Sequence, residues 1–222
     1  MTKHALIIGS KSDIAMELES FLLSDGWTTS GWHRNIAFPK VIPRWNLVLI
    51  ALGCVAPVGH WADVDADEWE ECINSNLMLP IKLLRLVWGG REPDASVCFM
   101  AGSNPQKIMN GYSAYNASKM ALLKTCEQLD QESSDAKFFA LAPGYVPTKI
   151  HRATLAAGWK NERIECGGGT SIELIYKCLK WCMEADKEIV GGRNICVSDP
   201  LGPQLVNQLA VNPAMFKLRR VQ

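Results

Sequence analysis

The sequence lacks a net charge, a long apolar run and any low-complexity segment. Its 23 basic and 23 acidic residues cancel to a formal net charge of zero, and no basic stripe is present, so we expect no nucleic-acid partner. No run of about 18 apolar residues could cross a membrane, and the apolar run near the N-terminus is too short for a secretory signal. These absences favour a cytoplasmic globular protein with no membrane partner.

Cysteine and histidine patterns of metal sites are also missing. None of the eight cysteines forms a C-x-x-C motif, and the four histidines do not lie near cysteines at ligand spacing, so we predict no metal site. We expect the scattered cysteines to be reduced thiols. With 222 residues, 48% of them hydrophobic, the chain is long enough for a single domain with a sizeable core over residues 1–222.

Short apolar runs alternate with helical periods along the chain. Strands are predicted at 4–9, 27–33, 47–53, 96–103, 137–144 and 194–198, and helices at 12–26, 65–90, 113–132 and 171–184. Pro80 lies inside the second helix and should break or kink it. The alternation predicts an α/β fold, a Rossmann-like, doubly wound parallel sheet with helices on both faces. Ligands of such sheets bind beyond the carboxyl ends of the strands, so functional residues should follow strands.

The turn after the first strand is a candidate phosphate site, because free N–H groups at a helix N-terminus attract anions. Its residues are Gly9, Ser10, Lys11, Ser12, Asp13 and Ile14. Only Gly9 remains of a three-glycine pattern, and Asp13 adds a negative charge, so a plain strand–helix turn is the alternative. Arg34 follows the second strand, where no acid is present. A base there accommodates a 2′-phosphate, which favours NADP(H) over NAD(H); the alternative is a surface arginine.

Three tyrosines have a lysine four residues later, a spacing that puts both side chains on one helix face. The pairs are Tyr115/Lys119, Tyr145/Lys149 and Tyr176/Lys180. Pro147 interrupts the second pair, and no residue at a strand end accompanies the third. The first pair differs because Ser103 ends a predicted strand just before its helix. Lys119 can lower the pKa of the phenol, and Ser103 can donate to a carbonyl oxygen, which predicts proton-transfer chemistry.

In this order, the Gly9 turn, Asn76, Ser103, the Y-x-x-x-K motif and Pro143-Gly144 with Thr148 resemble the short-chain dehydrogenases/reductases. The resemblance implies a Rossmann fold and hydride transfer between a nicotinamide and a small carbonyl substrate or alcohol. It implies Tyr115 as general acid, Lys119 on the nicotinamide ribose, Ser103 polarising the carbonyl and Asn76 supporting a water-mediated proton relay. The alternative for Asn76 is a local hydrogen bond near the helix kink.

The resemblance further implies a cofactor site, a lid and an oligomer. The implied cofactor-binding residues are Gly9, Ser10, Lys11, Ser12, Asp13, Ile14, Arg34, Ala51, Leu52, Gly53, Tyr115, Lys119, Pro143, Gly144, Val146 and Thr148. Residues 151–170 would form a substrate lid, in which Trp159 and Arg163 either contact a polar substrate or are merely exposed or packed. The long helices would form a homodimer or homotetramer.

Two departures from the family pattern stand out. Ile50-Ala51-Leu52-Gly53 replaces an Asn-Asn-Ala-Gly sequence. Only residues 36–46 separate the second predicted strand from the strand at 47, too few for the usual helix, strand and helix, so we expect a truncated segment and a more open adenine pocket. Three functions stay open: an NADPH-dependent ketone or aldehyde reductase, an inactive binding or scaffold protein, and a cofactor-retaining dehydratase or epimerase. Consumption of cofactor during turnover separates the first from the third.

Overall fold

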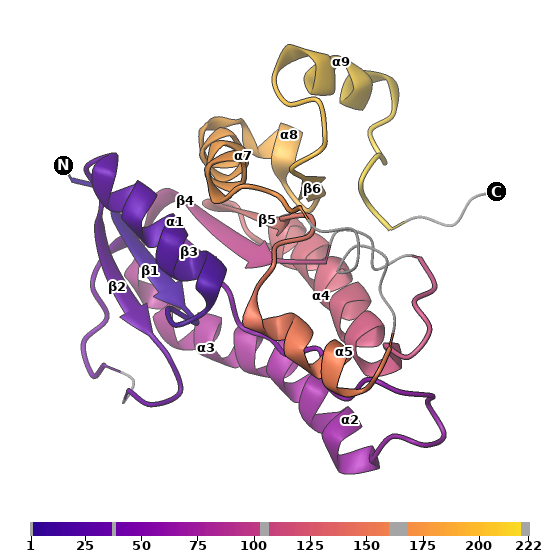
Figure 1. Ribbon diagram of the computed structural model, residues 1–222. Helices are drawn as coiled ribbons and strands as arrows, with labels where there is room; N and C mark the ends of the chain where they lie inside the picture. Colours follow the sequence, from indigo (N-terminus) through magenta and orange to yellow (C-terminus); the bar gives the residue numbers. More distant parts are fainter. Residues whose placement is uncertain (1, 37–38, 103–106, 160–167, 219–222) are drawn as a thin grey trace.

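The computed structural model describes residues 2–36, 39–102, 107–159 and 168–218 (Figure 1). These residues form one six-stranded sheet in the order β2-β1-β3-β4-β5-β6, and all neighbouring strands run parallel. The strands are β1 (His4–Ile8), β2 (Thr28–Trp32), β3 (Trp45–Ile50), β4 (Arg91–Met100), β5 (Ala136–Ala142) and β6 (Asn194–Cys196). The Rossmann-like α/β fold predicted from the sequence is confirmed.

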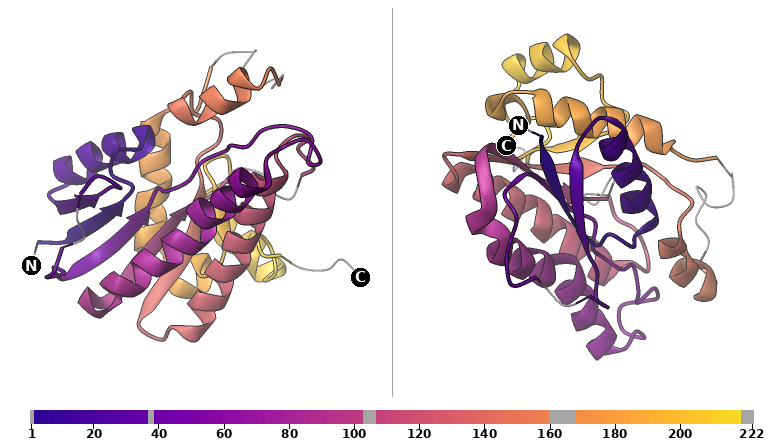
Figure 2. Two further views of the ribbon diagram at one scale, coloured as in Figure 1. Left: turned by 90° about the horizontal axis from the view of Figure 1, so that it is seen from below. Right: turned by 90° about the vertical axis from the view of Figure 1, so that its left-hand side faces the viewer.

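Helices cover both faces of this sheet (Figure 2). One face carries α1 (Asp13–Ser24) and α7 (Ile172–Glu184); the other carries α2 (Ala66–Ile73), α3 (Leu79–Val87) and α4 (Ser113–Glu132). The shorter helical segments are η2 (Trp88–Gly90), which falls within the helix predicted at 65–90, and four that the sequence did not predict: η3 (Lys149–His151), α5 (Arg152–Ala156), α8 (Lys187–Val190) and α9 (Pro203–Val211). Most of them are too short to display a helical period of apolar residues.

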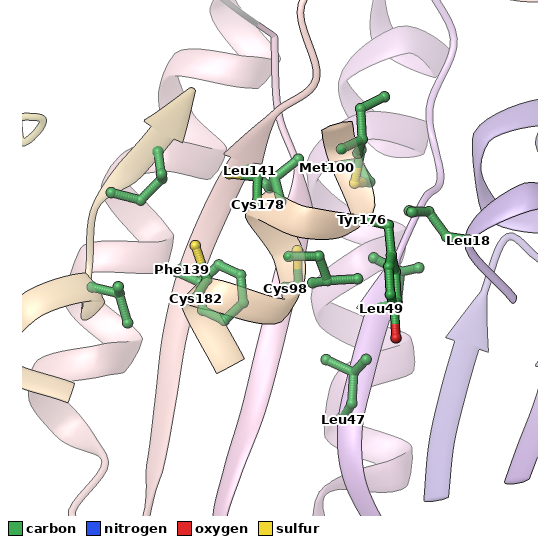
Figure 3. Close-up of a cluster of buried hydrophobic side chains, with 14 of the residues drawn as sticks. Leu18, Leu47, Leu49, Cys98, Met100, Phe139, Leu141, Tyr176, Cys178 and Cys182 are labelled. Atoms are coloured by element: carbon green, nitrogen blue, oxygen red, sulfur yellow. The ribbon is translucent and has the colours of Figure 1, made fainter. Parts of the chain in front are cut away.

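The two faces of the sheet each bury a separate apolar core. In β3, Leu47 and Leu49 point toward α1 and α7, where they meet Leu18 and Tyr176 (Figure 3). The alternate residues of β3 pack with the cluster on the α3 and α4 side. Successive strand residues point to opposite faces, so a strand buried on both faces is apolar at most positions. This explains why the central strands appear in the sequence as nearly continuous apolar runs.

The segment between β2 and β3 is truncated as predicted. Within it, the described residues 33–36 and 39–44 form neither a helix nor a strand, and β2 is the edge strand of the sheet. The segment instead packs under the end of the α3 helix: a Cβ built on Gly90 would lie 2.7 Å from the Pro43 carbonyl oxygen and 3.0 Å from Ile42 Cγ2. The chain therefore runs almost directly from the edge strand into the centre of the sheet.

The sequence predicts a break or kink at Pro80, and the structure shows helical backbone that continues through it with a local change of hydrogen-bond pattern. A π-helical turn, Asn74–Met78, joins α2 to α3, and the Leu79 N–H donates to the Asn74 carbonyl oxygen five residues earlier. Pro80 then falls in the first turn of α3, where a missing N–H costs little. Pro80 cannot donate to the Asn76 carbonyl, and the wider turn absorbs the resulting gap in the hydrogen-bond ladder.

Trp45 provides a test of this core. Its side chain is 0% exposed and its indole N–H donates to the Val87 carbonyl oxygen at 2.9 Å, so it ties β3 to the end of α3. Trp45→Ala should lower the free energy of unfolding by about 3–5 kcal/mol, measured by urea denaturation. Trp61→Ala removes an indole that is 72% exposed and should change it by less than about 0.5 kcal/mol. Equal unfolding midpoints for the two variants would contradict the packing described here.

Candidate active site

The strand order reverses at β1, since β2 lies on one side of it and β3 on the other. Crevices that bind ligands open at such a switch point, beyond the carboxyl ends of the strands. Gly9 follows β1, and Ala51–Gly53 follow β3, so two of the predicted cofactor segments flank this crevice. Gly9 has a φ of +91°, and a Cβ there would lie 2.7 Å from the Ala51 carbonyl oxygen. Only glycine fits between the two segments.

The turn that leads into α1 is joined to the end of β2. The N–H groups of Gly9 and Ser10 both donate to the Trp32 carbonyl oxygen, at 2.8 and 3.0 Å. Ser12 caps α1, because its Oγ accepts from the Ala15 N–H at 3.2 Å. Arg34, which is exposed, follows Trp32 by two residues. The structure therefore brings Arg34 to the edge of the sheet at which the Gly9 turn begins.

Asp13, the acid in this turn, has a cationic partner that the sequence analysis missed. Asp13 Oδ2 accepts from the Lys149 backbone N–H at 2.9 Å, and Lys149 Nζ lies 3.0 Å from Asp13 Oδ1. Lys149 Nζ also donates to the Lys11 carbonyl oxygen at 2.7 Å. The Lys149 backbone and side-chain hydrogen bonds lower the pKa of Asp13. The negative charge expected to oppose a phosphate is thus offset by a lysine from a distant segment.

The residues after β5 lie at the same edge of the sheet. Thr148 directly precedes Lys149, whose backbone N–H donates to Asp13. This hydrogen bond brings Thr148 to the turn before α1. Gly144 has a φ of +77°, and a Cβ on it would collide with Thr170 Oγ1. Pro143 and Val146 are buried beside it. The predicted cofactor segments after β1, β2, β3 and β5 are therefore all brought to one edge of the sheet.

Tyr115 and Lys119 lie on α4 and reach the ends of β3 and β4. Lys119 is 4% exposed, and its Nζ donates to the Met100 carbonyl oxygen, the last residue of β4, at 3.0 Å. The same Nζ lies 5.9 Å from the Tyr115 ring centroid and 3.5 Å from a Cβ built on Gly53. The phenol, the amine and the crevice-lining Gly53 thus converge at one point.

Ser103 lies outside the described residues, but the chain approaches Tyr115 one residue earlier. A Cβ built on Gly102 would lie 3.2 Å from the Tyr115 hydroxyl oxygen. The phenol hydroxyl therefore faces the segment that directly precedes Ser103. Of the predicted catalytic residues, the structure brings Tyr115, Lys119 and Asn76 together.

Burial decides the protonation of the pair. It raises the pKa of Tyr115 to about 12 and lowers the pKa of Lys119 to about 8. We expected Lys119 to lower the pKa of the phenol, and the structure reverses this direction, because loss of hydration penalises the phenolate more than the amine stabilises it. Tyr115 is consequently protonated at neutral pH and can donate a proton.

Asn76 is 0% exposed and lies in the π-helical turn. Its Nδ2 donates to the carbonyl oxygens of Cys54 and Cys72, at 2.9 and 3.0 Å, and its Oδ1 accepts from the Cys54 N–H at 3.2 Å. The Asn76 side chain also packs so closely on Gly53 that a Cβ at position 53 would collide with Asn76 Oδ1. The described contacts of this amide are structural: they hold the segment after β3 against the helix.

The other two tyrosine–lysine pairs have unrelated contacts. The Tyr176 hydroxyl donates to Asp25 Oδ2 at 2.8 Å, and Lys180 Nζ donates to the same oxygen at 2.6 Å, which fastens α7 to the end of α1. Tyr145 instead packs against His151, with ring centroids 5.0 Å apart. Identical spacing therefore produces three different environments, and of the three pairs only Tyr115 and Lys119 lie together beside Gly53.

The predicted lid, 151–170, begins with a helix that is fixed to the start of α4. Within α5, Thr154 is 0% exposed, and its Oγ1 accepts from the Tyr112 hydroxyl at 2.9 Å. Trp159 packs on Gly111, where a Cβ would lie 2.9 Å from the indole ring. At the far end, the Thr170 N–H donates to the Tyr145 carbonyl oxygen at 2.7 Å. Arg163 lies outside the described residues.

A cavity of ≈ 710 Å³ opens at this end of α4. It is lined mainly by apolar and aromatic groups, with a few polar ones, among them His60, Trp61, Ile108, Asn116 and Trp159. Asn116 follows Tyr115 directly in α4. Its Oδ1 is buried and has no hydrogen-bond partner among the described residues.

Two further sequence predictions concern the oxidation state of the cysteines and the absence of a membrane-spanning helix. The seven described cysteines are free thiols, as expected of a reduced protein. None of the helices that the structure describes has the length and apolar character needed to cross a membrane.

Comparison with known proteins identifies similar chains. The short chain dehydrogenase family profile matches residues 47–157, half of the chain. An uncharacterized oxidoreductase of Schizosaccharomyces pombe is 21% identical over 160 residues, which span 68% of this chain and 65% of that protein, just under two thirds of its length.

Two solved structures are similar in fold. One is a small-chain dehydrogenase in complex with NADPH, with a TM-score of 0.76 and 15% identity over 88% of this chain and 96% of that one. The other is an oxidoreductase of the short chain dehydrogenase/reductase family from Burkholderia thailandensis, with a TM-score of 0.74 and 15% identity over 97% of this chain and 99% of that one. At such identity these likenesses concern the fold alone.

The lowered pKa of Lys119 predicts a dependence of stability on pH. Below about pH 8 Lys119 is protonated in both the folded and the unfolded state, and its buried charge lowers the free energy of unfolding. Between about 8 and 10.5 the unfolded state binds more protons, so this cost is relieved as pH rises. Lys119→Met removes the cost at every pH.

The stability advantage of Lys119→Met over the wild type should therefore be largest below pH 8, on the order of 3 kcal/mol, and should shrink toward pH 10.5. Chemical denaturation at a series of pH values measures it. The control, Lys82→Met, removes an exposed amine from α3, and its difference from the wild type should stay constant. A constant difference for Lys119→Met as well would contradict the buried amine.

Proposed function

Because the chain belongs to the short-chain dehydrogenase family, we propose that this NAD(P)-dependent oxidoreductase reduces a ketone or aldehyde by hydride transfer from NADPH. The observation that supports the proposal most directly is the position of Tyr115 and Lys119. Lys119 Nζ lies beside Gly53 and the end of β4, and the Tyr115 hydroxyl faces Gly102 just after β4. A proton donor at the switch point of a parallel sheet is suited to chemistry on a bound dinucleotide.

The proposed reduction needs a hydride and a proton. When bound, the reduced nicotinamide supplies the hydride to the carbonyl carbon. Tyr115, protonated because burial raises its pKa to about 12, donates its proton to the carbonyl oxygen as negative charge develops there. We assign Ser103 the role of a second donor to this oxygen. Lys119, held by the Met100 carbonyl, would bind the nicotinamide ribose and replace the lost proton.

Asn76 has two proposed contributions. Its side-chain amide orients the segment Gly53–Cys54 that borders the crevice, which makes it a positioning residue. Its backbone lies in the π-helical turn, where Pro80 cannot donate to the Asn76 carbonyl oxygen. That oxygen is thus suited to hold a water molecule that relays protons toward Lys119.

The cofactor preference is proposed from Arg34. An exposed guanidinium follows β2 at the edge of the crevice, a position from which it can contact a 2′-phosphate. The similar small-chain dehydrogenase crystallised with NADPH is consistent with this choice. The remaining cofactor contacts would come from the Gly9 turn, from Ala51–Gly53 and from the segment of Pro143, Gly144, Val146 and Thr148.

The cavity beside α4 indicates which substrates would fit. Its aromatic and aliphatic lining favours a substrate with an apolar body. Residues 151–170 would act as the lid over it. We further propose a cytoplasmic protein that forms a homodimer or homotetramer. Association is supported by α3 and the π-helical turn before it, which expose the apolar side chains Met78, Leu79 and Leu86.

The cofactor preference is tested by fluorescence titration with NADPH and NADH. Arg34→Ala should weaken NADPH binding about tenfold, the loss of one exposed contact between a charge and a phosphate, and leave NADH binding nearly unchanged. Arg85→Ala, which removes an exposed cation from α3, is the matched control and should alter neither. An equal loss for both nucleotides would contradict a contact with the 2′-phosphate. Failure of the wild type to bind either nucleotide at millimolar concentration would favour a binding or scaffold protein.

The proton donor is tested with two tyrosine variants. Tyr115→Phe should lower kcat about 10²–10⁴-fold for a panel of ketones and aldehydes, without a comparable loss of NADPH affinity. Tyr176→Phe removes the hydroxyl of the equally spaced pair that binds Asp25 and should keep full activity. Equal activity of the two variants would exclude Tyr115 as the general acid, and turnover without net consumption of NADPH would favour a dehydratase or epimerase.

A further inference from the structure

Two thiols lie directly behind the proposed active site. Cys54 follows the crevice residue Gly53, and Cys72 lies near the end of α2, one helical turn before Asn76. Cys72 Sγ is 3.8 Å from the Cys54 carbonyl oxygen and 3.2 Å from Asn76 Nδ2. The two cysteines, 18 residues apart in sequence, are therefore held side by side by a single buried amide.

Their environments give the two thiols different reactivities. The Cys72 thiol hydrogen-bonds with Cys54 and lowers the pKa of Cys54 to about 7. Ser75 and the Lys119 ammonium lower it too, while burial and Glu71 act in the opposite direction. The pKa of Cys72 is raised by its contact with Cys54 and by burial. Cys54, which is partly exposed, thus has substantial thiolate at neutral pH, and Cys72 beside it stays protonated.

The pair differs from the other close cysteines of the chain. Cys178 and Cys182 are also neighbours on one helix, but both are 0% exposed, and burial raises the pKa of Cys182 well above its ordinary value. A dissolved oxidant cannot reach them. Cys196 is half-buried, and burial raises its pKa to about 12. Among the described cysteines, partial exposure and a lowered pKa occur together only at Cys54.

We propose that Cys54 and Cys72 form a peroxide-sensitive modification site, oxidised reversibly to a disulfide that switches off the adjacent active site. The Cys54 thiolate attacks one peroxide oxygen, so that the O–O bond breaks, a Cys54 sulfenic acid forms and hydroxide leaves. The Cys72 thiol then attacks the sulfenic sulfur. The S–O bond breaks, the S–S bond forms and the second oxygen leaves as water, which accounts for both electrons and both thiol protons.

The effect on activity follows from the shared amide. A disulfide would draw Cys54 toward α2, and Gly53 moves with it. Gly53 lies against Asn76 Oδ1 and close to Lys119 Nζ, so its displacement disturbs the amine. A displacement of about 1 Å in a catalytic group can cost about 100-fold in rate. This consequence rests on the proposed function, whereas formation of the disulfide does not.

The test treats the purified chain with hydrogen peroxide and maps its cysteines by mass spectrometry after alkylation. We expect a peptide that links Cys54 to Cys72, lighter by two hydrogen atoms and cleaved by dithiothreitol. Cys178, Cys182 and Cys196 should stay alkylatable. NADPH-dependent activity should fall about 100-fold and return with the reductant. If no linked peptide forms, or if Cys178 and Cys182 are oxidised as readily as Cys54 and Cys72, the proposal is overturned.

Three variants separate the modification from the proposed function. Cys54→Ser and Cys72→Ser should each keep their own untreated activity after peroxide, and Cys196→Ser, the matched control, should lose activity as the wild type does. If a serine variant does not fold, the wild-type peptide map still decides the chemistry. A linked peptide in a protein that never turns over NADPH would refute the reductase and leave the thiol site standing; an unlinked pair in an active reductase would do the reverse.

Discussion

All six strands run parallel, and helices cover both faces of the sheet, and this constraint decides where functional groups can lie. Parallel strands deliver their carboxyl ends to one edge of the sheet, so the segments after β1, β2, β3, β4 and β5 gather there although they are distant in sequence. Because helices cover the two faces, this edge is the place where polar side chains can meet without entering a core. The Gly9 turn, Gly53, Lys119 and Thr148 all lie there.

Asn76 shows how one buried polar group connects the fold with the site. It is wholly buried, and an unpaired amide in such a position would be costly. Its partners are the backbone of Cys54 and the backbone and thiol of Cys72, and they fix the segment after β3 against the π-helical turn. The irregular turn, the proline that follows it and the thiol pair therefore belong to one small unit behind Lys119. Gly53 lies between this unit and the amine.

Electrostatic balance at the crevice depends on contacts between distant segments. Asp13 places a carboxylate at the N-terminus of α1, where an anion would bind, and Lys149 from the segment after β5 offsets its charge. The pair is partly exposed, so its direct contribution to stability is small. Its structural effect is larger, because it draws Thr148 and the start of the lid toward the cofactor turn.

Local patterns in the sequence were sufficient to predict the strands, the long helices and the truncated edge after β2. Strands that are buried on both faces of the sheet appear in the sequence as apolar runs. The segment of residues 36–46 is too short to contain another helix, strand and helix. The sequence also singled out Tyr115 and Lys119, because helical spacing and a preceding strand end are local features. Tertiary structure alone decided the tolerance of Pro80, the Asp13–Lys149 pair, the meeting of Cys54 with Cys72, and the direction of the Tyr115 pKa. Each of these depends on which distant groups exclude water from a side chain or supply its partner, and no local pattern encodes such contacts.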